Sequence, residues 1–254
     1  MNRRDFLNLA AGSVGSALFG QSLTPQAAAS SKIKAVAFDA FTTFDPRPVF
    51  ALAEKLFPGK GVELSNAWRI RQFEYQWLRA LSGRYADFWQ ATDEALVFAA
   101  NLLKLDLSAD KRERLMQAYL KRQAWPDAGP ALRSLRDLGV RLALLSNATP
   151  GMLDAWIRHS SLDDIYEYVL STNTIRTYKP DPRAYRMGVE AFGMKVEEIA
   201  FAAFGGWDVA GAKWFGYTTF WVNRLGLPVE ELGVAPDGVG GSLAELVIFV
   251  QSRS

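Results

Sequence analysis

The hydrophobic pattern of the chain changes its period along the sequence. Residues 33–38 form a short apolar run, typical of a buried central strand in a parallel sheet. From about residue 49 to residue 120 apolar positions recur at helical spacing, and from residue 126 short apolar runs alternate with helical segments. Strands alternating with helices of this length predict an α/β fold, a doubly wound parallel sheet with right-handed crossovers.

The elements expected after residue 126 form one alternating series. They are strands at 140–145, 168–171, 199–204 and 218–222, and helices at 131–138, 152–160, 182–192, 209–215 and 243–250. The Gly- and Pro-rich segment 226–241 is expected to be a loop. A helical block straight after the first strand is most simply a cap over the carboxyl edge of the sheet. We therefore expect a Rossmann-like core domain from residues 30–45 and 126–254 and a helical cap domain from residues 46–125.

The composition excludes several kinds of chemistry. The 254 residues include no cysteine, so disulfides, thiol nucleophiles and thiolate metal sites are ruled out. His159 is the only histidine and falls on a polar helix end, which argues against Ser-His-Asp and Cys-His hydrolysis. The net charge is +2 without a long basic run, so nothing indicates a nucleic-acid partner.

The amino end resembles a twin-arginine export signal. Arg3 and Arg4 precede a weakly apolar region at residues 7–19, and an A-x-A pattern follows at residues 27–29. The apolar region is too short and too rich in Gly and Ser to span a bilayer stably, so no stable membrane anchor is expected. We expect residues 1–29 to be a signal peptide, cleaved after Ala29, that takes the folded protein to the periplasm through the export machinery. An uncleaved tether or a chance helix is the alternative.

Polar side chains follow the ends of several expected strands. Asp39 comes directly after the first strand, and Ser146, Asn147 and Asp208 come after later ones. In open α/β sheets ligands bind at the carboxyl ends of the strands, so these residues are candidates for one site. A strand-end aspartate can also simply cap the next turn, and Ser-Asn is common in turns.

The stretch IKAVAFDAFTTFD at residues 33–45 resembles the first motif of the haloacid dehalogenase superfamily. The resemblance implies that Asp39 is a covalent nucleophile and that Thr43 fills the hydroxyl position of the motif. Phosphatases of that superfamily carry a second aspartate two residues later, where this chain has Phe41. A phenyl ring cannot protonate a leaving alkoxide, whereas a departing halide needs no proton. The pattern therefore resembles the type II (L-2-haloacid) dehalogenase branch.

The same resemblance assigns roles to residues of the later motifs. Ser146 and Asn147 hold the anionic group of the substrate, Lys179 keeps the nucleophile ionised and binds the substrate carboxylate, and Asp208 activates water. In the cap, Arg69 matches the arginine that receives the halide. The remaining substrate-binding candidates line the pocket or follow the lysine motif; they are Phe41, Phe73, Phe88, Tyr185 and Trp207. Aromatic residues at helical spacing are equally typical of a plain core.

Two positions depart from the dehalogenase pattern. Ala203 and Gly205 stand where dehalogenases have a serine and an asparagine that help to place the hydrolytic water. The expected activity is hydrolysis of short L-2-haloalkanoic acids to 2-hydroxy acids through an aspartyl ester. No cofactor is expected, and no metal, because few carboxylates remain around Asp39; a homodimer is a further expectation. The alternatives are a superfamily phosphatase or phosphotransferase, and a periplasmic small-anion binding protein with weak or lost turnover.

Overall fold

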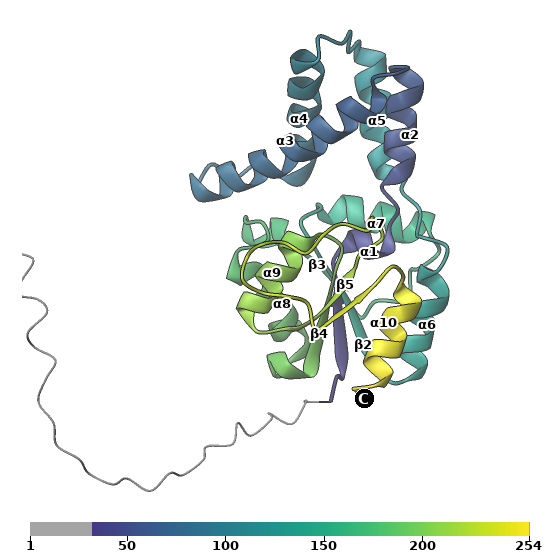
Figure 1. Cartoon of the computed structure of the whole chain (residues 1–254), viewed down its shortest axis with the longest axis vertical. Coiled ribbons are helices and arrows are strands. Elements are labelled where there is room, and N and C mark those ends of the chain that lie inside the picture. The colour runs from purple at the N-terminus through teal and green to yellow at the C-terminus, as the bar shows by residue number, and fades with distance from the viewer. Residues whose placement is uncertain (1–31, 254) are drawn as a thin grey trace, which may run out of the picture. The chain divides into compact units, whose positions relative to one another are not determined.

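The computed structural model describes residues 32–253. A parallel six-stranded sheet forms the centre of the molecule (Figure 1). The strand order is β3-β2-β1-β4-β5-β6, and every neighbouring pair is parallel. The strands are β1 Ala35–Phe38, β2 Arg141–Ser146, β3 Tyr168–Ser171, β4 Ile199–Ala203, β5 Thr218–Val222 and β6 Gly238–Gly240. This arrangement confirms the expected α/β class.

Helices cover both faces of the sheet. They are α6 Ala128–Asp137, α7 Pro150–His159 and α10 Leu243–Gln251 on one face, and α8 Pro182–Phe192 and α9 Gly206–Phe215 on the other. Alternate side chains of β1 enter the two layers: Val36 and Phe38 pack with the first set, and Ala35 and Ala37 with the second. Burial on both faces explains why β1 is an uninterrupted apolar run.

A block of helices lies between β1 and β2 in the sequence. A short helix, α1 Ala40–Thr43, follows β1 directly, and then come α2 Arg47–Leu56, α3 Gly61–Leu81, α4 Phe88–Leu102 and α5 Ala109–Leu120. Figure 1 shows α2 to α5 gathered beyond the end of the sheet where α1 and α7 lie. Residues 32–253 belong to one compact unit, so the division into a core domain and a cap domain stays a prediction.

The element boundaries agree closely with the hydrophobic pattern. Strands β3 and β5 and helix α8 occupy the expected residues, and α5 begins after Ser108, whose side chain accepts a hydrogen bond from the Lys111 amide. Strand β6 differs from the prediction, since it lies in the Gly- and Pro-rich segment 226–241 for which the sequence predicts a loop. Its glycines admit the close packing of Phe220 and Phe249 against the backbone.

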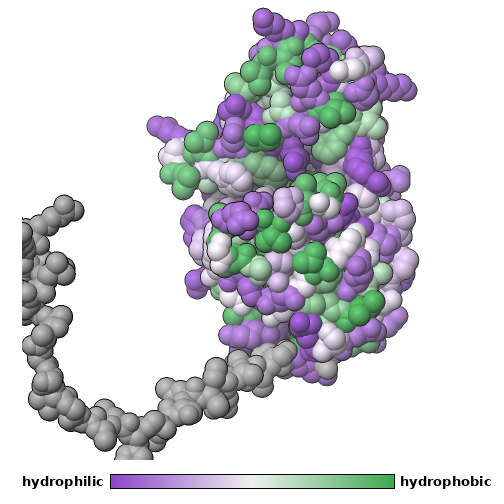
Figure 2. All heavy atoms as spheres, viewed as in Figure 1, coloured by the Kyte–Doolittle hydropathy of each residue, from purple (hydrophilic) through white to green (hydrophobic). Residues whose placement is uncertain are grey.

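The expected signal peptide, residues 1–29, lies outside the described residues. Within the described part of the chain, no helix combines the length and the apolar character needed to cross a bilayer. On the face shown in Figure 2, polar and apolar residues are mixed in small groups over both the helical block and the sheet-containing part.

Candidate active site

Asp39 lies at the carboxyl end of the central strand. Phe38, the last residue of β1, pairs with Leu144 of β2 and Ala202 of β4, so the loops after these three strands open at one edge. Asp39 is buried, and its Oδ2 accepts the Phe41 amide at 3.2 Å, which caps α1. Its other oxygen is left to face the residues that follow the neighbouring strands. The aspartate is therefore both a helix cap and part of a polar cluster.

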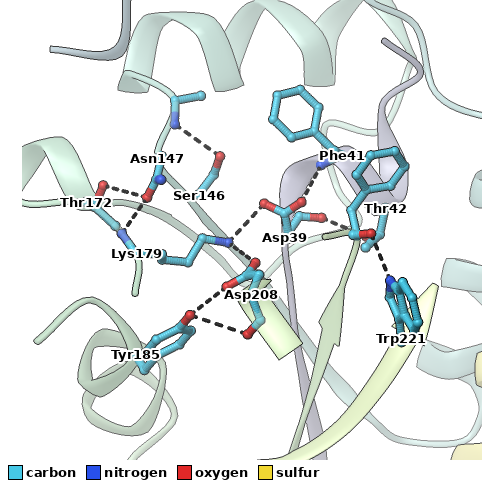
Figure 3. Close-up of polar contacts among 12 residues, drawn as sticks. Asp39, Phe41, Thr42, Ser146, Asn147, Thr172, Lys179, Tyr185, Asp208 and Trp221 are labelled. Atoms are coloured by element: carbon cyan, nitrogen blue, oxygen red, sulfur yellow. Dashed lines mark hydrogen bonds and ion pairs between the residues drawn. The ribbon is translucent and has the colours of Figure 1, made fainter. Parts of the chain in front are cut away.

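One lysine joins two carboxylates in this cluster (Figure 3). Lys179 Nζ donates to Asp39 Oδ1 at 2.9 Å and to Asp208 Oδ2 at 2.6 Å. The hydroxyl of Tyr185, on α8, donates to Asp208 Oδ1 at 2.7 Å. These four side chains are buried. The structure thus brings together four of the residues that the sequence predicts for the site.

The electrostatics of the cluster follow from one cation shared by two anions. Burial alone would lower the pKa of Lys179, but the charges of Asp208 and Asp39 outweigh it and raise that pKa. Burial raises the pKa of Asp208, Lys179 lowers it and Asp39 raises it, and the balance is a pKa of about 6. Burial and Asp208 both raise the pKa of Tyr185, which stays a hydrogen-bond donor. Because of its burial and the neighbouring Asp39 charge, Asp208 takes up a proton more readily than an ordinary aspartate.

Asn147 holds the loop that carries the lysine. Its Oδ1 accepts the Lys179 amide at 2.9 Å and the Thr172 hydroxyl at 3.3 Å. Its Nδ2 donates to Gln76 Oε1, on α3, at 3.1 Å. The neighbouring Ser146 hydroxyl accepts the Ala148 amide at 3.1 Å, and Figure 3 shows it next to Lys179 and Asp39. The expected anion-binding pair is at the site, and in this structure Asn147 is used to connect α3 with Lys179.

Helix α3 contacts the site through a row of aromatic residues. Trp77 Nε1 donates to the Lys179 carbonyl at 3.1 Å. The Phe73 and Trp77 rings stack at 5.7 Å, and both meet the Trp207 ring edge-on, at 5.3 and 5.6 Å between centroids. Phe73 and Trp207, expected from the sequence as pocket residues, therefore form one aromatic wall with Trp77, which was not expected.

Within the described residues, no hydrogen bond joins the side chains of the remaining expected site residues to the Asp39–Lys179–Asp208 cluster, although the Phe41 amide donates to Asp39. The Thr43 hydroxyl is bonded to the Tyr166 hydroxyl at 2.7 Å, and Phe88 is buried at the start of α4 in the core. Arg69 is exposed on α3 and makes no hydrogen bond or ion pair with other residues of the 32–253 range. Phe41 packs against Trp156, with ring centroids 5.9 Å apart. The catalytic role of Arg69 and the substrate contacts of Thr43 and Phe88 stay predictions.

Three residues near the site, Gln76, Trp77 and Arg122, were not expected from the sequence. A buried glutamine on an amphipathic helix, or a buried arginine in the segment after one, carries no signal that separates it from a solvated residue, because only the packing decides which way it points. The tryptophan belongs to an apolar pattern and could be found only as a general core residue.

The described residues contain no group of three or more His, Asp or Glu side chains placed to hold a metal ion. At the edge where hard cations would need clustered oxygen ligands, the Lys179 ammonium occupies the space between the Asp39 and Asp208 carboxylates.

The two positions that depart from the dehalogenase pattern lie next to this cluster. Ala203 is fully buried at the end of β4. Gly205 is the N-cap residue of α9, the helix that carries Asp208, and a Cβ atom there would lie 2.7 Å from Trp207 Nε1. The indole of Trp207 therefore fills the space that a side chain at position 205 would need.

Comparison with known proteins defines the class. Residues 24–216 match the model of the haloacid dehalogenase-like hydrolase family. Haloacetate dehalogenase H-2 of Moraxella sp. (strain B) is 43% identical over 81% of this chain and 92% of its own length. The (S)-2-haloacid dehalogenase of Pseudomonas sp. (strain YL) is 41% identical over 87% of this chain and 96% of its own. The chain belongs to the haloacid dehalogenase-like hydrolase family.

A solved structure places the likeness within that family. The crystal structure of an L-2-haloacid dehalogenase matches with a TM-score of 0.85 and 43% identity, covering 87% of this chain and all of that one. The similarity therefore extends over the sheet and the helical block together.

Proposed function

We propose that this hydrolase is a dehalogenase that converts short L-2-haloalkanoic acids to 2-hydroxy acids through an ester on Asp39. The observation that carries the proposal is the buried Asp39 carboxylate, bonded to Lys179 through one oxygen and to the Phe41 amide through the other. A carboxylate fixed by two hydrogen bonds gains by proximity what it lacks in nucleophilicity. The names of the relatives support the substrate class.

In the first half-reaction, an Asp39 oxygen forms a bond to C2 of the substrate as the carbon–halogen bond breaks, and the halide leaves with the electron pair. No proton is transferred, which fits Phe41 at the position where an acid/base would stand. The substrate carboxylate is held by the Ser146 hydroxyl, by Lys179 and by amides of the loops after β1 and β2.

In the second half-reaction, water hydrolyses the ester and the 2-hydroxy acid leaves. Asp208 is the base, since its carboxylate shares Lys179 with the nucleophile and is oriented by the Tyr185 hydroxyl. Attack on C2 in the first step and on the ester carbonyl in the second gives inversion at C2.

Replacement of Asp39 by asparagine tests the proposal. Asp39→Asn keeps the shape and the acceptor for the Phe41 amide, but it removes the charge that attacks C2, so we expect no halide release at an unchanged melting temperature. Asp45→Asn is the matched control and should keep its activity, because among the described residues the Asp45 side chain accepts hydrogen bonds only from Arg47. Halide release is measured with L-2-chloropropionate, and an adduct at Asp39 is sought by mass spectrometry. Near wild-type release by Asp39→Asn would refute the assignment.

The same screen separates the alternatives. A Mg²⁺-dependent burst with a generic phosphate ester would favour a phosphatase. A shift in melting temperature with 2-haloacids without halide release would favour a binding protein that has lost turnover.

We further propose export of the folded protein to the periplasm. Arg3, Arg4 and the A-x-A pattern that ends at Ala29 support this. Replacement of both arginines by lysine should reduce the periplasmic yield and leave the cytoplasmic pool active. An unchanged periplasmic yield would refute the targeting proposal.

A further inference from the structure

Arg122 is a buried arginine without an anionic partner. It follows α5, in the segment that leads back from the helical block to α6, and only 2% of its surface is exposed. Its Nε and Nη1 have no hydrogen-bond partner among the described residues. Its Cζ lies 4.2, 4.6 and 5.2 Å from the ring centroids of Tyr119, Phe41 and Trp156. The guanidinium is therefore held by ring faces, and its Nε and Nη1 donors are left without an acceptor among the described residues.

Arg224, which is half-buried, offers a comparison: only its Nε is left unpaired among the described residues. Arg224 also lies over a ring, that of Trp125, but its Nη1 is 3.0 Å from Asp127 Oδ1 and its Nη2 donates to the Thr42 carbonyl at 3.0 Å. A buried charge without such a partner is costly, and apolar residues of similar volume commonly do as well or better for stability. Burial lowers the pKa of Arg122 to about 10, so the group still carries its proton at neutral pH. The chain keeps a cation where stability alone does not require one.

The position of Arg122 connects it with the reaction centre. The ring that it covers is that of Phe41, whose amide donates to Asp39 Oδ2, on the side of Asp39 away from Lys179 (Figure 3). The negative charge of Asp39 acts on Arg122. The buried Tyr119 phenol feels the positive charges of both Arg122 and Arg69. Arg122 therefore packs on the residue that follows the nucleophile by two positions, and it acts on Tyr119 together with Arg69, the exposed arginine that sequence resemblance suggests for the halide.

We propose that Arg122 forms a halide subsite, in which its unpaired N–H groups receive the halide ion expelled from C2. This inference rests on the proposed dehalogenase function and deepens it. As the Asp39 oxygen bonds to C2, the carbon–halogen electron pair leaves with the halogen, and the resulting anion is stabilised by a guanidinium that stays protonated throughout. In a site without bulk water such a charge interaction is stronger than at the surface.

A purely structural role for Arg122 makes different predictions. If the side chain only fastened the aromatic cluster, its loss would slow all substrates by one common factor. If it receives the leaving group, its loss harms poor leaving groups most, because a transition state with a poor leaving group depends more on stabilisation of the departing charge.

Three variants test the proposal. Arg122→Met keeps the length and the apolar packing of the side chain, and Arg122→Lys keeps its charge. Arg141→Met is the control. Arg141 also lies over a ring, that of Phe192, but at the opposite end of β2 from Ser146. The halide burst is measured with L-2-chloropropionate and L-2-bromopropionate. Loss of a charged hydrogen bond should slow chloride release by Arg122→Met about ten- to hundredfold. Bromide release should fall less, Arg122→Lys should recover part of the loss, and Arg141→Met should match wild type.

Halide binding provides a readout without turnover. Bromide that binds at Arg122 should quench the tryptophan fluorescence of wild type, since the Trp156 ring lies against the guanidinium. Arg122→Met should weaken bromide binding at least tenfold. Equal loss for both leaving groups, or bromide binding unchanged in Arg122→Met, would overturn the inference. If Arg122→Met does not fold, Arg122→Lys decides by the same chloride-to-bromide ratio. Failure of wild type to release halide from any 2-haloacid would instead refute the proposed function itself.

Discussion

Restoring a hydroxyl at position 203 should accelerate ester hydrolysis and leave halide release unchanged. Both oxygens of Asp208 already accept a hydrogen bond, one from Lys179 and one from Tyr185. The water that hydrolyses the ester must therefore be held by this carboxylate alone, beside these two bonds. Ala203 contributes only a methyl group at this edge of the sheet. In the wild type we therefore expect the ester on Asp39 to accumulate during turnover.

The magnitude follows from the number of missing contacts. One hydrogen bond to a buried polar group contributes about 1–3 kcal/mol, which corresponds to about ten- to hundredfold in rate. Ala203→Ser should shorten the life of the adduct by a factor in this range. The halide burst should not change, since Asp39 keeps its bonds to Lys179 and the Phe41 amide.

Position 205 offers a contrast. Because a Cβ there would lie 2.7 Å from Trp207 Nε1, Gly205→Asn cannot be accommodated unless the indole moves. That indole packs on Phe73 and Trp77, so Gly205→Asn should disturb the aromatic wall and lower substrate affinity. Ala203→Ser is thus the cleaner of the two replacements.

Rapid-quench mass spectrometry with L-2-chloropropionate measures the adduct at Asp39 against time. Ala202→Ser is the matched control, because Ala202 is just as buried on the same strand but faces the other side of the sheet. We expect a long-lived adduct in wild type and in Ala202→Ser, and a shorter-lived one in Ala203→Ser. An absent adduct during steady turnover, without a gain from Ala203→Ser, would mean that another group already holds the water.

Four further outcomes can be measured. Turnover should survive exhaustive treatment with EDTA, and strict recovery by Mg²⁺ would contradict the dehalogenase proposal. Hydrolysis of the Asp39 ester should slow as the pH falls and Asp208 takes up a proton; because the ester removes the Asp39 charge that helps to raise the pKa of Asp208 to about 6, the slowing should begin below that pH, and a rate constant independent of pH wherever the protein stays folded would contradict its role as base. Gly211→Ala should lower the free energy of unfolding by about 1–3 kcal/mol in a denaturant titration, since the added methyl would meet the Tyr185 hydroxyl and Pro180. Gln76→Leu should reduce kcat several-fold, because Asn147 loses its acceptor and holds Lys179 less firmly, and Gln76→Glu should restore part of the rate.

Much of the fold could be predicted because local sequence and sheet geometry agree. The apolar run before Asp39 fits a strand covered on both faces, and Gly139, with φ at +77°, ends α6 where the helical pattern stops. Because β1, β2 and β4 are parallel neighbours, the residues after their ends had to meet at one edge. Three of the site residues, Asp39, Ser146 and Asp208, follow from that rule and the motif order.

The residues contributed by the helical block could not be predicted in the same way. A helix pattern gives the apolar face of α3 but not which loop that face meets. The bond from Gln76 to Asn147 and that from Trp77 to Lys179 depend on how α3 docks, which no local signal fixes. The burial of Arg122 likewise depends on Tyr119 and Trp156, which lie on different helices.

The departure at position 205 shows why composition at a site cannot be interpreted without its packing. Counted along the sequence, Gly205 is a lost polar side chain and suggests an empty space for water. In the structure that space is occupied by the Trp207 indole, which packs edge-on against Phe73 and Trp77 of α3. An indole N–H can donate a hydrogen bond but cannot accept one, so it cannot replace an asparagine oxygen as acceptor of a water proton. In the proposed mechanism the base function therefore falls on Asp208 alone, and the lifetime of the Asp39 ester would report how well one carboxylate performs it.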